Sequence, residues 1–420
     1  MWKRLFLTAM ILILLATSCA QSSVSSIERK IQRVENGLIR EYRDPLWERM
    51  TLAERMEYYN VPGVSIAVIN DFEVEWVKGY GASEAGGNKP VTPDTLFQAA
   101  SIGKPVVAVA ALHYVEAELL DLGENVNERL ISWHVTENEF TAQEKVTLRR
   151  LLSHSAGVTV SGFGGYAQGE EIPILQQILD GEPPANSPPI RVDIVPGTQH
   201  RYSGGGYMIV QQLLMDVTGK PFPEIMQETV LRPSGMISST FEYPLPKERE
   251  DAAATGHRAN GQPLKGKWHT YPEMGAGASL WTTPSDLARF AIEIMLSYAE
   301  QSSEVLSQDM ANQMLAPQID DRGLGPVMGD DGGDLLYFMH PGGNEGFRCV
   351  LVAYPKRGQG VVIMTNGDSG EALWREILNS VSVAYGWVRD YTNVYLSISI
   401  GVMVIVVGML LLRRIKPKLT

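Results

Sequence analysis

The chain has 420 residues, of which 44% are hydrophobic and 20% are charged, values that are common among globular proteins. This length is enough for one large domain or two smaller ones with packed cores. The formal net charge is -12. Because an acidic chain without a basic face cannot neutralise phosphates, the composition argues against a nucleic-acid partner.

Residues 1–20 have the pattern of an export signal. Two basic residues open the segment, residues 5–16 are apolar, and small residues follow. Two interpretations fit its end. Cleavage after Ala20 would give a mature chain without lipid, whereas Cys19 could be the lipidated first residue, since the letters before it resemble the lipobox of bacterial lipoproteins. Both stay open, and both predict that the protein leaves the cytoplasm.

Secondary-structure signals change along the exported part, residues 27–388. Charged and apolar residues alternate at helical spacing over residues 27–59. Runs rich in β-branched residues predict two strand pairs, 64–69 with 72–77 and 350–354 with 360–364. Helices are expected at 101–119, 207–217, 284–296 and 371–385. The polar residues 242–272 are expected to form a long surface excursion.

This order of elements predicts an α/β (α+β) fold. Strands near both ends should form one antiparallel sheet flanked by helices, and the middle of the chain should form an inserted, mostly helical lobe. A functional site is expected in a cleft between sheet and lobe.

The first chemical motif lies at the expected start of the helix at 101–119. Ser101 and Lys104 are three residues apart, so they share a helical face and the amine can lie beside the hydroxyl. Serine is a weak nucleophile near neutral pH, and a neutral amine can accept its proton as the oxygen attacks a carbonyl carbon. The spacing alone is weak, since about one such pair arises by chance in a chain of this size.

Two glycine-rich motifs follow. Tyr202 precedes Gly204, Gly205 and Gly206, so it could be presented from a loop and act as an acid or base near a cationic lysine. Taken singly, a ring packed under a glycine turn explains it better.

The other motif, His340 to Gly343, is expected at the start of a strand. Its glycines, Gly342 and Gly343, would let a backbone N–H join that of Ser101 in a two-donor oxyanion hole. Taken singly, a glycine-rich hairpin is the simpler reading.

Residues 394–412 form an uncharged segment long enough to cross a hydrocarbon core of roughly 30 Å. Aromatic residues precede it and four basic residues lie in the tail, residues 413–420. The positive-inside rule then places the tail in the cytoplasm and the body outside, so we expect a membrane tether. Cys349 is the only cysteine besides Cys19 and is expected to be buried in a strand.

Together the three motifs resemble, in order and spacing, those of the serine β-lactamase and penicillin-binding protein superfamily. The resemblance is closest to its class C-like branch, which includes D,D-peptidases, D-aminopeptidases and esterases, and it covers about residues 43–385. It implies a β-lactamase/transpeptidase-like fold, an acyl-enzyme on Ser101, and proton transfer by Lys104 and Tyr202. It also implies an oxyanion hole from the N–H groups of Ser101 and Gly343, with His340 and Gly342 lining the substrate site. No cofactor or metal is implied.

Two positions depart from the family pattern. Gly204 stands where the second motif usually has Asn, and His340 stands where the third usually has Lys. A histidine with a pKa of about 6.5 is largely neutral at pH 7, so a permanent charge for a substrate carboxylate is missing. Both changes argue against efficient β-lactam hydrolysis.

The sequence therefore predicts a membrane-tethered, extracytoplasmic serine hydrolase acting on an amide or ester. Small peptides, cell-wall fragments, esters and β-lactam-like compounds are the candidate substrates. The alternative is a penicillin-binding-type receptor that is acylated, or binds ligand, without efficient turnover. The natural substrate, the oligomeric state and the choice of Lys104 or Tyr202 as base stay open.

Other signals were weaker. Residues 367–370 match the nucleophile signature of trypsin-like proteases, but they lie between a strand and a helix, where such residues are common caps. The chain has no Gly-x-Ser-x-Gly elbow, and its seven histidines lack metal-binding spacing. His154 is expected to be a hydrogen-bonded structural histidine.

Overall fold

The computed structural model describes residues 25–40, 50–330 and 336–387. The expected export signal, the segment 394–412 and the basic tail lie outside these residues. Within the described part of the chain, no helix is long and apolar enough to cross a membrane.

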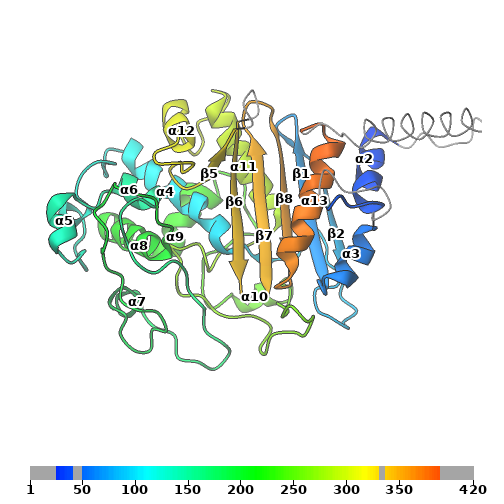
Figure 1. Ribbon diagram of the computed structural model, residues 1–420, viewed down its shortest axis with the longest axis horizontal. Coiled ribbons are helices and arrows are strands. Elements are labelled where there is room, and N and C mark those ends of the chain that lie inside the picture. Colours follow the sequence, from blue (N-terminus) through cyan, green and yellow to red (C-terminus); the bar gives the residue numbers. More distant parts are fainter. Residues whose placement is uncertain (1–24, 41–49, 331–335, 388–420) are drawn as a thin grey trace, which may run out of the picture.

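A six-stranded antiparallel sheet forms the centre of the molecule, with strand order β2-β1-β8-β7-β6-β5 (Figure 1). Its strands are β1 (Gly63–Asn70), β2 (Glu73–Gly81), β5 (Val327–Gly329), β6 (Tyr337–Asn344), β7 (Phe347–Tyr354) and β8 (Gln359–Thr365). A small second sheet pairs β3 (Phe97–Gln98) with β4 (Trp281–Thr282). The prediction of one antiparallel sheet built from segments near both ends is confirmed.

Helices cover both faces of this sheet (Figure 1). One face packs on α2 (Ser26–Glu35), α3 (Leu52–Tyr58) and α13 (Gly370–Ala384). The other packs on α11 (Pro284–Tyr298) and on the helical lobe. The remaining helices are α4 (Gly103–Glu116), α5 (Glu139–Gln143), α6 (Leu148–Leu152), α7 (Leu175–Asp180), α8 (Gly204–Thr218), α9 (Phe222–Met226), α10 (Lys247–Glu250) and α12 (Gln308–Leu315).

The central strands are apolar on both sides because both faces are covered. In β1, Ala67 and Ile69 belong to the core on the α11 side, whereas Ile66 and Val68 belong to the core under α13. All four side chains are fully buried. A strand buried on both faces shows a continuous apolar run in the sequence, without polar alternation.

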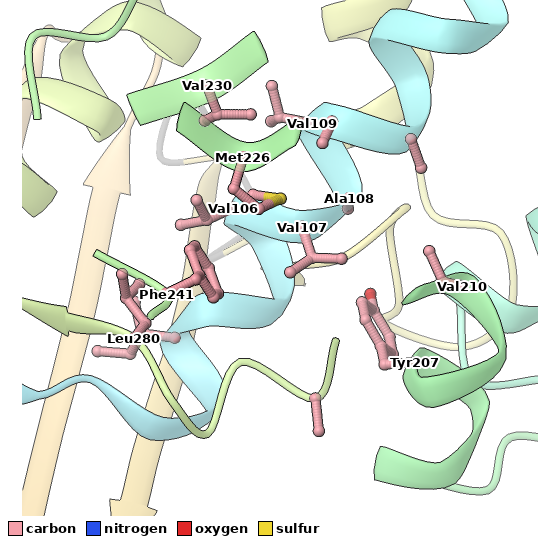
Figure 2. Close-up of a cluster of buried hydrophobic side chains, with 14 of the residues drawn as sticks. Val106, Val107, Ala108, Val109, Tyr207, Val210, Met226, Val230, Phe241 and Leu280 are labelled. Carbon is pink, nitrogen blue, oxygen red and sulfur yellow. The ribbon is translucent and has the colours of Figure 1, made fainter. Parts of the chain in front are cut away.

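Helix α4 runs through the core of the lobe. Residues 106–109 are all fully buried, so every side of the helix faces protein, as expected for a helix without a polar stripe. The side chains around it come from α8, α9 and three other segments (Figure 2), and include Tyr207, Val210, Met226, Val230, Phe241 and Leu280. The N-terminus of α4 is therefore held in a rigid environment.

The segment 242–272 differs from the prediction of a surface excursion. Ala254 and His257 are fully buried. The Nδ1 atom of His257 lies 2.8 Å from the carbonyl oxygen of Asn366, and its Nε2 accepts a hydrogen bond from the backbone of Ala85 at 3.0 Å. Through His257 the segment is hydrogen-bonded to the residues that follow β2 and β8, which the composition alone does not reveal.

Candidate active site

Ser101 lies in a 3-10 turn, Ala100–Ile102, directly before α4. The helix begins at Gly103 and not at Ser101 as the sequence suggested. Ala100 has a φ of 49°, a left-handed conformation that costs a residue with a Cβ roughly 1–2 kcal/mol. A Cβ on Gly103 would lie 2.5 Å from Gly277 Cα, so glycine lets the loop carrying Gly277 approach the turn.

Lys104 is buried, with 2% of its surface exposed, and its amine faces Ser101. Its Nζ lies 2.9 Å from Ser101 Oγ and donates a hydrogen bond to the carbonyl oxygen of Ala276 at 2.8 Å. The rings of Tyr202 and Tyr207 lie 5.0 and 5.8 Å from the amine. The serine and lysine predicted as a pair are thus in contact.

Tyr202 lies beside the same amine, just before α8. Gly204, Gly205 and Gly206 form the first turn of this helix and not the loop expected from their composition. A Cβ on Gly205 would lie 2.7 Å from the carbonyl oxygen of Thr159, so packing of the helix end against residues 159–161 requires glycine. Ser203 caps the helix by accepting a hydrogen bond from Gly206 at 2.9 Å.

His154 packs against the ring of Tyr202. The two rings are 4.3 Å apart, and His154 Nδ1 accepts a hydrogen bond from the backbone of Ser203 at 3.1 Å. Its Nε2 is buried without a hydrogen-bond partner among the described residues. Burial, and then the nearby Lys104, hold the pKa of His154 well below its usual range, so the ring is neutral. The hydrogen bond expected of a structural histidine is present, while its contact with Tyr202 was not foreseen.

The third motif lies within β6, close to its end, and not at the start of a strand. Strand β6 pairs with β7 over its length but with β5 only up to Met339, so His340 and the residues after it form a sheet edge. A proline such as Pro341 is tolerated at an edge because no neighbouring strand needs its N–H.

Strand β6 approaches the nucleophile segment closely. A Cβ on Gly342 would lie 2.1 Å from the carbonyl oxygen of Ala99, which only glycine avoids. Cys349, fully buried in β7 as predicted, donates a hydrogen bond from Sγ to the same oxygen at 3.0 Å. A Cβ on Gly343 would meet nothing closer than 3.4 Å. The third motif thus approaches the Ser101 turn, while Tyr202 of the second motif lies by the amine of Lys104.

His340 is buried and uncharged. Burial, followed by the charge of Lys104, lowers its pKa to about 3. Its Nδ1 lies 2.7 Å from the carbonyl oxygen of Pro341, so in the neutral ring Nδ1–H donates to that oxygen. The ring centroid is 6.2 Å from that of Tyr202. The sequence predicted that His340 carries no permanent charge at pH 7, and its buried surroundings favour the neutral ring further.

A cleft of about 530 Å³ opens beside these motifs. Its lining residues are Ser101, Tyr202, Arg322, Val327, Met339, His340, Pro341, Gly342, Gly343, Arg348, Glu371 and Trp374. Five predicted site residues line it, and Lys104 lies buried next to Ser101. Two arginines, Arg322 and Arg348, were missed, because no motif or spacing in the sequence points to them.

Ser369 lies elsewhere, at the N-cap of α13, and its Oγ donates to the carbonyl oxygen of Ala259 at 3.3 Å. Among the residues that the structure describes, no group of three or more His, Cys, Asp or Glu side chains could hold a metal ion.

Fold and site together are those of a protein with a Ser-x-x-Lys nucleophile between a sheet and a helical lobe. The chain matches the family Beta-lactamase over residues 49–380, and therefore belongs to this family. The superfamily predicted from the three motifs is confirmed, while its class C-like branch stays a prediction.

Similar proteins include the unguisins hydrolase ungD' of Aspergillus campestris, 24% identical, with 74% of this chain and 60% of that protein covered. The chain thus spans less than two thirds of that relative. Penicillin-binding protein 4 of Amycolatopsis lactamdurans is 25% identical, with 80% and 90% covered.

Among solved structures, an octameric penicillin-binding protein homologue from Pyrococcus abyssi superimposes with a TM-score of 0.64 at 22% identity, covering 78% of this chain and 75% of that one. At this identity the similarity shows the fold alone.

Proposed function

We propose that the protein is a serine hydrolase that cleaves an amide or ester through an acyl-enzyme on Ser101. The observation that carries this proposal is the 2.9 Å contact between Lys104 Nζ and Ser101 Oγ, at the edge of a cleft. A nucleophile and a base within hydrogen-bond reach are the minimum for covalent catalysis.

In the proposed mechanism, Ser101 Oγ attacks the carbonyl carbon and its proton passes to the Lys104–Tyr202 pair. The backbone N–H groups of Ser101 and Gly343 bind the oxyanion. Collapse of the tetrahedral intermediate breaks the bond to the leaving group, which takes a proton from the same pair. Water, giving a proton to the same pair, then attacks the acyl carbon, the bond to Ser101 Oγ breaks, Oγ takes the proton back, and the carboxylic acid product leaves. The assignment of the base to one residue is left open, since the two groups titrate together.

We propose small peptides, cell-wall fragments or esters as substrates, in a class C-like enzyme. The neutral His340 supports this over efficient β-lactam hydrolysis, because it supplies no charge for a carboxylate at that point. The names of the fungal hydrolase and the bacterial penicillin-binding protein are consistent with an acyl-transfer reaction.

We also propose that residues 394–412 anchor the enzyme in a membrane with residues 27–388 outside the cytoplasm. The uncharged segment and the basic residues after it support this topology. Protease added to sealed cells should digest the domain, while a tag after residue 420 stays protected; the reverse result contradicts the topology.

The function is tested by assaying the full chain in detergent against esters, amino-acid amides, short peptides and a penicillin. Ser101→Ala should lose turnover by about a millionfold, as in other nucleophile deletions. Ser369→Ala is the matched control and should retain full activity. Hydrolysis retained by Ser101→Ala overturns the proposal, and stable acylation of Ser101 without turnover supports the receptor alternative.

A further inference from the structure

The backbone turn that carries the proposed nucleophile is strained and is tied to the sheet. Ala100 has a left-handed backbone, and such a conformation persists only where its surroundings fix it. Part of this restraint acts through Ala99, whose N–H donates to the carbonyl oxygen of Leu280 at 2.9 Å and whose carbonyl oxygen accepts from the N–H of Ile102 at 3.2 Å. The same oxygen also accepts the hydrogen bond from Cys349 Sγ at 3.0 Å. The turn is therefore held by strand β7 as well as by its own chain.

The thiol of Cys349 fills space that Gly342 leaves open. The two residues are direct partners across β6 and β7. A Cβ on Gly342 would lie 2.6 Å from Cys349 Sγ and 2.1 Å from the carbonyl oxygen of Ala99. Strand β6, the thiol and this carbonyl group are thus in mutual contact. Ser101 lies two residues beyond one side of the contact and Gly343 one residue beyond the other, so it joins the segments that carry the two proposed oxyanion donors.

The thiol is a neutral donor with a defined acceptor. Cys349 is fully buried, and burial raises the pKa of its thiol far above the usual range, so the sulfur keeps its proton near neutral pH. The carbonyl oxygens of Gly342 and Gln98 lie farther from Sγ, at 3.6 and 3.8 Å, so the bond to Ala99 is the shortest of the three. A serine here would keep a donor on a shorter side chain, and an alanine would supply neither the donor nor the volume.

A second, separate contact joins the same two segments. Asn344, the last residue of β6, donates from Nδ2 to Gln98 Oε1 at 2.7 Å and to the carbonyl oxygen of Ala278 at 2.8 Å. Gln98 directly precedes Ala99. Loss of the Cys349 bond alone should therefore leave the two segments together and change how firmly the Ala99 carbonyl group is held.

We propose that Cys349 is a positioning residue that sets the spacing of the two oxyanion donors by holding the Ala99 carbonyl group against β6. The N–H groups of Ser101 and Gly343 come from segments far apart in the sequence, so their spacing depends on the contacts between these segments. A displacement of about 1 Å at a reacting centre can cost about 100-fold in rate. Cys349 does not line the cleft, so it acts through the backbone and not on the substrate. This inference rests on the proposed function and adds a residue that fixes the geometry of its oxyanion site.

The kinetic test compares three variants of the full chain in detergent, with 4-nitrophenyl butyrate as the ester. Cys349→Ala should lower kcat about 10- to 100-fold and change KM less than about threefold, because the oxyanion donors act on the transition state. Cys349→Ser should recover part of kcat, and it replaces the alanine variant in each comparison if that variant does not fold. Val350→Ala is the matched control. It truncates the next residue of β7, which is fully buried on the opposite face, and should lose stability but keep kcat.

Hydrogen exchange tests the hold on Ala99 without any substrate. Exchange at the amide of Ile102, which bonds to the Ala99 carbonyl oxygen, should be faster in Cys349→Ala and unchanged in Val350→Ala. Unchanged exchange in Cys349→Ala, a kcat within threefold of the parent enzyme, or equal losses of kcat in Cys349→Ala and Val350→Ala overturns the inference. Turnover retained by Ser101→Ala overturns the proposed function instead, and the exchange result does not depend on it.

Discussion

Two buried cations on opposite faces of the sheet have different surroundings. Behind the sheet, Arg55 of α3 pairs with Glu376 of α13 at 2.9 Å, and the Tyr59 hydroxyl donates to the same carboxylate at 2.6 Å. On the lobe side, Lys104 contacts a hydroxyl and a carbonyl oxygen, and none of the ion pairs among the described residues includes it. A compensated charge joins two helices, whereas an uncompensated amine beside Ser101 is available for chemistry.

Replacing the lobe-side cation should give the largest effect. Lys104→Met removes the amine beside Ser101, and with it one member of the Lys104–Tyr202 pair that takes up the serine proton, so kcat/KM should fall by about 10³- to 10⁴-fold. The fold should persist, because methionine fills a similar volume and leaves no buried charge. Steady-state kinetics on the best ester, with circular dichroism as the control, checks this. Activity within tenfold of the parent enzyme would contradict the role of Lys104.

Replacing Arg55, the cation on the α13 side of the sheet, should lower stability and leave activity unchanged. Arg55→Met leaves Glu376 buried without its cationic partner and should lower the free energy of unfolding by about 3–5 kcal/mol. At temperatures where the variant is folded, kcat/KM should be unchanged. Urea unfolding and kinetics on the same sample measure both. Loss of activity without loss of stability would contradict the structural role that distinguishes Arg55 from Lys104.

Low pH should lower the free energy of unfolding through protonation of His340. Its pKa is about 3 in the folded protein and about 6.5 when unfolded, so only the unfolded state takes up the proton between these values. Stability from this group is complete above pH 6.5 and declines as pH falls toward 3, by about 3 kcal/mol at pH 4.

His340→Asn removes this titration and should show a shallower loss of unfolding free energy between pH 7 and pH 4. Equal slopes for the two proteins would show that His340 is not buried in its neutral form.

A smaller effect should distinguish two adjacent glycines in β6. Gly342→Ala places a Cβ 2.1 Å from the carbonyl oxygen of Ala99, so β6 must move away from the Ser101 turn. We expect a loss of about 1–3 kcal/mol in stability, together with reduced activity. In Gly343→Ala the nearest atom, in Arg348, is 3.4 Å away, and stability should change little. Thermal melts compare the two, and equal effects would contradict the close approach.

The parts of the molecule that the sequence predicted depend on local patterns. Strand β1 follows from its β-branched residues, and α11 follows from Thr283 as N-cap with Pro284 after it. The pairing of Ser101 with Lys104 follows from their separation by three residues, which one turn of helix brings together.

The parts that the sequence did not predict depend on contacts between distant segments. Gly204 to Gly206 suggested a loop from their low helix propensity, but contact with residues 159–161 makes them the start of α8. Arg322 enters the cleft only because β5 pairs with β6, and no spacing signals that pairing. The contact between His154 and Tyr202 likewise joins residues 48 positions apart.

The central claim is that Ser101 forms the acyl-enzyme, and mapping a covalent adduct tests it most directly. The full chain is treated with a fluorophosphonate and, separately, with a labelled penicillin, then digested and analysed by mass spectrometry. The fluorophosphonate adduct should lie on Ser101, be absent from Ser101→Ala and form far more slowly in Lys104→Met; any penicillin adduct should lie on the same residue. An adduct on Ser369 instead, or one that persists in Ser101→Ala, would contradict the account.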